Sequence, residues 1–155
     1  MKIFFSILLC LFSVTLFAQE NNGPDSLSFC FLKYKVPEGC TAQSEYQVSC
    51  DNYSMTWLYL TEQMMKTVPE QFIDQLTGQV KVVKKEPVTC YLMGQPAKGY
   101  LVSFKQMAEL NYQLIIYGTA NRQPVIVQLV LVKEPKTNAD LPAFPAKFIN
   151  ITRDK

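Results

Sequence analysis

The chain has 155 residues, with 15 basic and 13 acidic side chains, a net charge of +2 and no histidine. Such a nearly neutral chain lacks the dense basic surface on which nucleic-acid binding depends. Without histidine it cannot build a serine–histidine or cysteine–histidine catalytic pair, or a histidine metal site. We therefore expect a non-catalytic protein without a cofactor, of a length that suits one domain.

Residues 1–18 have the three parts of a secretory signal peptide. Lys2 supplies a positive start, an apolar run follows, and Ala18 is a small residue before a polar stretch. The run is shorter than the ~20 apolar residues of a transmembrane helix. We expect cleavage near Ala18, a flexible leader over residues 19–26 and a single domain over residues 27–155. The protein would then be periplasmic or secreted, with no membrane anchor left after cleavage.

Cleavage would remove Cys10 and leave four cysteines, Cys30, Cys40, Cys50 and Cys90. An even number in an exported protein indicates disulfides, because the compartment is oxidising. Four cysteines allow three pairings, and the sequence does not choose among them. We favour Cys40–Cys50, which closes a local loop, and Cys30–Cys90, which ties the first strand to the middle of the sheet.

Alternating apolar and polar residues predict three strands in succession, over residues 30–36, 45–50 and 54–60. A helix should follow from Thr67 to Gly78. Thr67 and Glu70 have the spacing of a capping box, Pro69 fits the first turn, and Gly78 supplies the stop.

The rest of the chain is rich in strands, predicted over residues 80–85, 88–92, 99–105, 112–117 and 125–132. Connections this short join antiparallel neighbours. Phe144, Phe148 and Ile151 recur at helical spacing, so a closing helix is expected over residues 141–151 despite Pro142 and Pro145. The predicted fold class is α+β, a single antiparallel sheet of about seven or eight strands flanked by two helices.

This order of elements, with a first strand that ends at Pro37-Glu38-Gly39, resembles the PsbP-like superfamily over residues 29–151. The resemblance implies an α/β/α sandwich and a role in binding or scaffolding. Cys40 stands where family members often carry a tryptophan, and no functional residue carries over. The end of the signal, Phe17-Ala18-Gln19-Glu20, resembles the signals of Bacteroidetes. In that phylum the tripeptide Asp25-Ser26-Leu27 resembles an O-glycosylation site, with Ser26 as the acceptor.

The leading hypothesis is an exported binding module for a protein partner in the cell envelope, such as an immunity protein or an envelope accessory factor. Aromatic side chains bury a large area at a low entropy cost, so they are the expected contacts. Tyr53, Trp57 and Tyr59 are the first choice. Tyr100, Tyr112 and Tyr117 are further candidates.

Two other functions remain open. A carrier of a small apolar ligand would use a cavity between helix and sheet, lined by Met64, Met65, Phe72 and Phe144. A hydrolase without a known motif would need two carboxylates to converge in one pocket. Its candidates are Asp51, Glu62 and Glu109.

Overall fold

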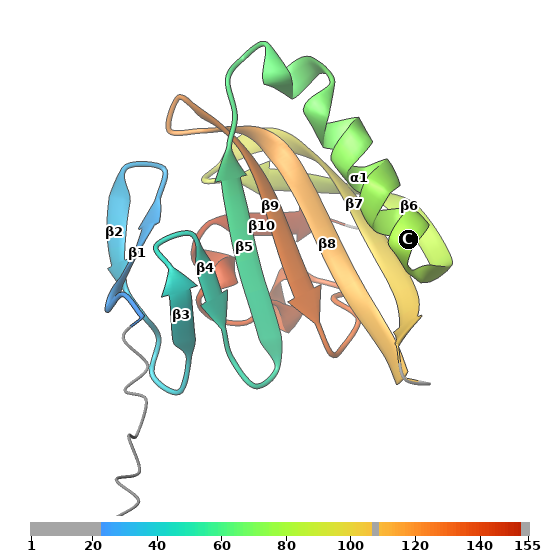
Figure 1. The fold of residues 1–155 in the computed structure, drawn as a ribbon, viewed down its shortest axis with the longest axis horizontal. Coiled ribbons are helices and arrows are strands. Elements are labelled where there is room, and N and C mark those ends of the chain that lie inside the picture. The colour runs from blue at the N-terminus through green and yellow to red at the C-terminus, as the bar shows by residue number, and fades with distance from the viewer. Residues whose placement is uncertain (1–22, 107–108, 153–155) are drawn as a thin grey trace, which may run out of the picture.

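The computed structural model describes residues 23–106 and 109–152. Eight antiparallel strands form one sheet in the order β10-β6-β7-β8-β9-β5-β4-β3, and a two-stranded hairpin, β1-β2, stands beside it (Figure 1). The strands are β1 (Ser26–Phe29), β2 (Leu32–Lys35), β3 (Thr41–Ser44), β4 (Gln47–Ser49), β5 (Tyr53–Tyr59), β6 (Lys81–Leu92), β7 (Gln95–Gln106), β8 (Glu109–Ala120), β9 (Gln123–Leu131) and β10 (Ile149–Thr152).

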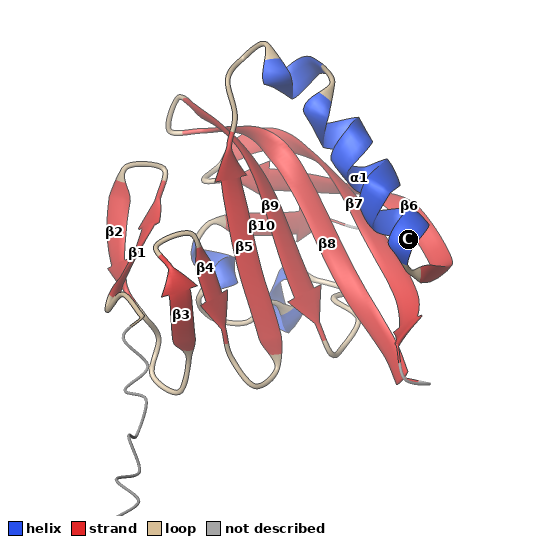
Figure 2. Ribbon diagram, in the orientation of Figure 1, coloured by secondary structure: helices blue, strands red, loops and turns tan. Residues whose placement is uncertain are grey.

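The first face of the sheet is covered in part by the helix α1 (Val68–Gln79), which follows a short turn, η1 (Met64–Lys66) (Figure 2). Ile73 of α1 is fully buried in an apolar cluster whose sheet residues come from β7, β8 and β9. The helix begins with a proline in its first turn, as predicted, but the Thr67 side chain makes no capping bond and the helix runs through Gly78. Within the described parts of the chain, no helix is long and apolar enough to cross a membrane.

The second face of the sheet carries the main core. The β1-β2 hairpin and the segment before β10 pack against it through a cluster of aromatic rings. The ring of Phe29 lies 5.4 Å from that of Trp57 and 4.5 Å from that of Phe148, while Tyr34 contacts Phe144 and Phe148 edge-on. Such edge contacts add to the free energy gained from burial alone. The hairpin is therefore part of the core, although it shares no strand pairing with the large sheet.

The predicted closing helix is wrong. A short 3-10 turn, η2 (Asn138–Asp140), precedes residues 141–151. The segment itself contains a second 3-10 turn, η3 (Pro145–Lys147), and then enters the strand β10. Proline lacks an N–H and disfavours a helical residue before it, so Pro142 and Pro145 prevent a regular helix. Ile149 and Ile151 instead alternate with polar residues and pair with Leu92 and Cys90 of β6. The two-helix fold class is thus corrected to one helix on an eight-stranded sheet.

Two strand boundaries also differ from those predicted. Residues 30–36 are not one strand, because the chain reverses at Cys30-Phe31 between β1 and β2. Glu86-Pro87 is not a turn, since β6 runs through it without interruption. Pro87 is tolerated there because β10 pairs only with Thr89–Leu92 and leaves the outer edge of β6 open before it.

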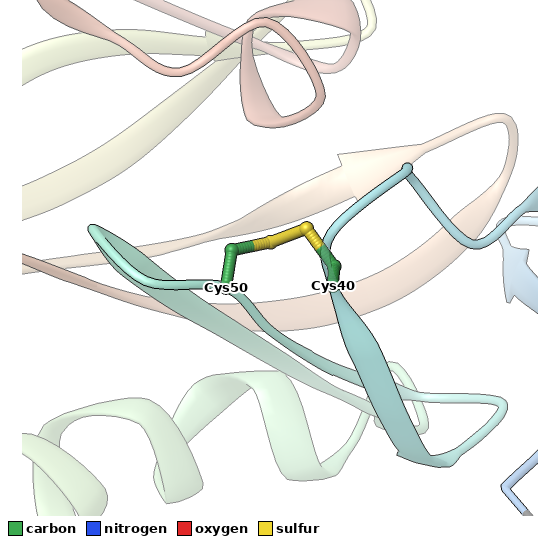
Figure 3. Close-up of a disulfide and its surroundings, with 2 residues drawn as sticks. All are labelled: Cys40 and Cys50. Carbon is green, nitrogen blue, oxygen red and sulfur yellow. A yellow bond between two sulfur atoms is a disulfide. The ribbon is translucent and has the colours of Figure 1, made fainter.

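The predicted Cys40–Cys50 disulfide is confirmed. Cys40 precedes β3 and Cys50 follows β4, and their Cα atoms lie 4.4 Å apart (Figure 3). The second predicted disulfide is not formed, because Cys30 and Cys90 are free and buried. Cys90 lies on β6, and three strands separate β6 from β5, whose Tyr59 hydroxyl accepts a hydrogen bond from the backbone N–H of Cys30.

Candidate functional site

Three two-residue turns of the structure have positive φ at both positions. They are Cys30-Phe31 between β1 and β2, Met93-Gly94 between β6 and β7, and Asn121-Arg122 between β8 and β9. Tight hairpins favour this backbone, and glycine or asparagine normally supplies it. The first turn contains neither, with φ of +46° at Cys30 and +70° at Phe31. A left-handed conformation costs other residues roughly 1–2 kcal/mol each.

Three side chains, two from β5 and one from the β8-β9 turn, hold the Cys30-Phe31 turn in place. The Tyr59 hydroxyl donates to the Ser28 carbonyl at 2.9 Å and accepts the Cys30 N–H at 2.7 Å. The Trp57 indole N–H donates to the same Ser28 carbonyl at 2.8 Å, and the Asn121 side chain donates to the Cys30 carbonyl at 2.9 Å. Since these four bonds satisfy backbone groups at the turn, they fix its position as well as its shape.

We call residues 30–32, which comprise this turn and the first residue of β2, the β1-β2 tip. Its Cys30 side chain is fully buried, whereas Phe31 is 72% exposed and Leu32 is 41% exposed. Phe31 is the most exposed of the large apolar side chains in the described residues. The basic residues Lys33 and Arg122 flank the tip, because Lys33 follows it along the chain and Arg122 follows Asn121. The tip therefore exposes an aromatic ring, and the chain carries a basic residue directly after it and another next to the bonded Asn121.

The aromatic residues proposed as partner contacts lie mostly inside the protein. Tyr53 is 8% exposed and Trp57 is 3% exposed, and both belong to the core of the second face. Tyr59 is half-buried and bonded to the hairpin backbone. These positions leave Tyr53 and Trp57 without a surface for a partner. Trp57 and Tyr59 bond the hairpin backbone and so support the tip, whereas Tyr53 lies at the other end of β5.

The carboxylates proposed for hydrolysis do not come together. Asp51 is in the turn between β4 and β5, and Glu62 follows β5. Glu109 begins β8, at the end of the sheet opposite Glu62 (Figure 1), and all three are exposed.

Both free thiols are unsuited to nucleophilic attack. Burial raises the pKa of Cys30 to about 11 and that of Cys90 to about 12, so each remains a neutral thiol.

The four residues proposed to line a carrier cavity are also dispersed. Met64 is 40% exposed, Phe72 packs in the helix cluster, and Phe144 belongs to the opposite face of the sheet. Met65, on η1, lines a hollow together with residues of β7 and β8, and the other three do not share it. The predicted acceptor Ser26 is half-buried at the first position of β1, and its O-glycosylation stays a prediction.

A second surface feature is an open groove beside α1, here called the α1 groove. It consists of two adjoining hollows of about 500 and 550 Å³ that share Ala97, Lys98 and Tyr117. The Tyr117 hydroxyl donates to a carboxylate oxygen of Glu70, in the first turn of α1. Burial, the bond to Glu70 and the nearby negative charge raise the pKa of Tyr117 well above its ordinary value, so the hydroxyl stays protonated.

Sequence patterns missed both features for identifiable reasons. Phe31 alternates with the exposed Lys33 and Lys35, and a phenylalanine on a polar face is the one signal that could have revealed the tip. Glu70 was interpreted as a capping residue, but its carboxylate bonds to Tyr117, which is 47 residues away. No periodicity reports a contact between residues so far apart.

The outer edge of β6 is unsuited to pairing with another strand. Lys84 and Lys85 lie on it, Pro87 lacks a donor, and a β-bulge lies between Val82 and Lys84. Charge, proline and a bulge are the usual protections of an exposed edge.

No protein-family model matches the chain, and no curated protein matches it either. The resemblance to the PsbP-like superfamily therefore stays a prediction, and no residue role can be transferred from a relative.

Proposed function

We propose that the protein is an exported, non-catalytic binding module that contacts a protein partner through the β1-β2 tip. The observation that carries this proposal is the exposure of Phe31 on a left-handed backbone that four hydrogen bonds hold in place. Strained backbone persists only where the surrounding structure enforces it, and it is concentrated at functional sites. An aromatic side chain on a fixed backbone also loses little conformational entropy when it binds.

The partner we propose has an apolar pocket for the Phe31 ring and acidic residues at the rim of that pocket. Aromatic side chains that fill a pocket contribute most of the binding energy in many interfaces. Lys33 and Arg122 beside the tip would attract an acidic rim and favour the correct orientation. Such charges affect the association rate more than the final affinity.

The location outside the cytosol is supported by the Cys40–Cys50 disulfide, since such bonds form and persist in oxidising compartments. The signal peptide proposed for residues 1–18 lies outside the described residues. Together they favour the periplasm or the cell exterior as the place where the partner is met.

The test is site-specific photo-crosslinking in the producing cell, with a benzophenone amino acid in place of Phe31. We expect one discrete protein adduct, and its yield should fall when excess purified wild-type protein competes, but not when the Phe31→Gly protein does. The matched control is the same probe at Val83, which is 54% exposed and lies on β6. No adduct at position 31, or adducts identical to those at position 83, would overturn the proposal.

A further inference from the structure

The α1 groove is lined by three charged side chains, Glu70, Glu86 and Lys98. Glu86 forms an ion pair with Lys84, while Glu70 and Lys98 have opposite charges and do not pair with each other. Glu70 and Lys98 line the same hollow, both are exposed, and no ion pair joins them. Glu70 accepts the Tyr117 hydroxyl through one carboxylate oxygen, and its other oxygen has no partner in the described residues. Lys98 likewise has no ion-pair partner there. A groove with separated and unused charges of both signs complements a ligand that carries both signs.

Both charges are placed by regular structure. Lys98 pairs across the sheet with Tyr117 on β8 and with Thr89 on β6, so all three share the face beside α1. Tyr117 is 7% exposed, and its protonated hydroxyl fixes the Glu70 side chain by a hydrogen bond. Sites built on strands and helices hold their groups more accurately than sites on loops.

The walls between the charges supply both apolar and polar contacts. Met65 and Ala97 line the second hollow, while Thr89, Tyr100 and Thr152 line the first. Each hollow lies within the range of roughly 300–1,000 Å³ that is typical of small-molecule sites. The combination fits a ligand with two charged ends and an apolar side chain.

We infer that the α1 groove binds a short zwitterionic peptide. Its ammonium group would lie at the open oxygen of Glu70, its carboxylate at the Lys98 ammonium, and an apolar side chain against Met65 and Ala97. This site is separate from the β1-β2 tip, and the inference does not depend on the tip having a partner.

The test is an NMR titration of the full chain after signal removal, labelled with ¹⁵N, with the dipeptide leucyl-leucine as the probe. We expect saturable shifts at the backbone amides of Thr89, Lys98 and Tyr117, with a dissociation constant below about 1 mM. N-acetyl-leucyl-leucine lacks the ammonium and leucyl-leucine amide lacks the carboxylate. Each should bind at least about tenfold more weakly, because one charge in the groove is then left without a partner.

Variants separate the two charged contacts. Glu70→Gln should weaken the binding of leucyl-leucine about tenfold and leave the binding of N-acetyl-leucyl-leucine unchanged. Lys98→Gln should likewise weaken the binding of leucyl-leucine about tenfold and leave the binding of leucyl-leucine amide unchanged. Lys105→Gln, on the same strand but outside the groove, is the matched control and should change neither. The absence of saturable shifts, or equal affinity for the dipeptide and both blocked forms, would overturn the inference. Crosslinking at Phe31 is unaffected by either result.

Discussion

The turns at Cys30-Phe31 and Met93-Gly94 share the same signs of φ but reach them differently. In the β6-β7 turn, Gly94 takes φ of +80° at no steric cost. In the β1-β2 turn both residues have side chains, and hydrogen bonds from Trp57, Tyr59 and Asn121 hold the backbone around them. The β6-β7 turn thus holds one residue with a side chain at positive φ, Met93, whereas the β1-β2 turn holds two. We propose that the extra strain of the β1-β2 turn is kept because it displays Phe31.

Among the substitutions that test the difference between the two turns, Tyr59→Phe should cause the largest loss of stability. The change keeps the ring but removes the hydroxyl, which bonds both the Ser28 carbonyl and the Cys30 N–H. Because the Cys30 N–H would be left without a partner, the free energy of unfolding should fall by about 2 kcal/mol. Urea unfolding measures it.

The control is Tyr46→Phe, whose ring contacts that of Tyr59 but whose hydroxyl makes no hydrogen bond in the described structure. Its free energy of unfolding should change by less than about 0.5 kcal/mol. Equal losses in the two variants would show that the Tyr59 hydroxyl does not hold the turn.

Smaller losses of stability are expected from one substitution that affects each turn. Asn121→Gly keeps a residue that accepts positive φ but removes the bond to the Cys30 carbonyl, so stability should fall by about 1 kcal/mol. Gly94→Ala should cost a similar amount, about 1 kcal/mol, for the opposite reason, because alanine is strained at φ of +80°. Thermal unfolding of both proteins would test this.

The two substitutions should lower stability by similar amounts but differ in their effect on crosslinking at position 31. Asn121→Gly loosens the tip and should reduce the yield of the adduct, while Gly94→Ala should leave the yield unchanged. The reverse pattern would contradict the role assigned to Asn121.

Local patterns were enough to predict most of the strands and the helix α1, and of the two favoured cysteine pairs only Cys40–Cys50 is formed. β5 and β9 follow from alternation and apolar runs, and Pro69 marks the start of α1. The prediction of a closing helix was wrong. Phe144 and Phe148 have helical spacing, but the backbone around Pro142 and Pro145 cannot form a regular helix. A periodic pattern reports which side chains are buried, and proline decides whether a helix can bury them.

The candidate site was less predictable, because it depends on contacts between distant parts of the chain. Tyr59 and Asn121 reach the Cys30 backbone across 29 and 91 residues. The left-handed turn at Cys30-Phe31 also breaks the usual preference for glycine or asparagine, so turn chemistry favours an unbroken strand there. The position of the site is therefore a property of tertiary structure, and only the exposed Phe31 is visible in the sequence.

The most direct test of the account is the free energy of unfolding of the Phe31→Gly protein beside the wild type. If Phe31 is kept for display at a cost in backbone strain, glycine should relieve that strain and raise the free energy of unfolding by about 1 kcal/mol. A decrease of similar size would show that Phe31 stabilises the folded protein. That result would contradict the claim that the β1-β2 tip trades stability for binding.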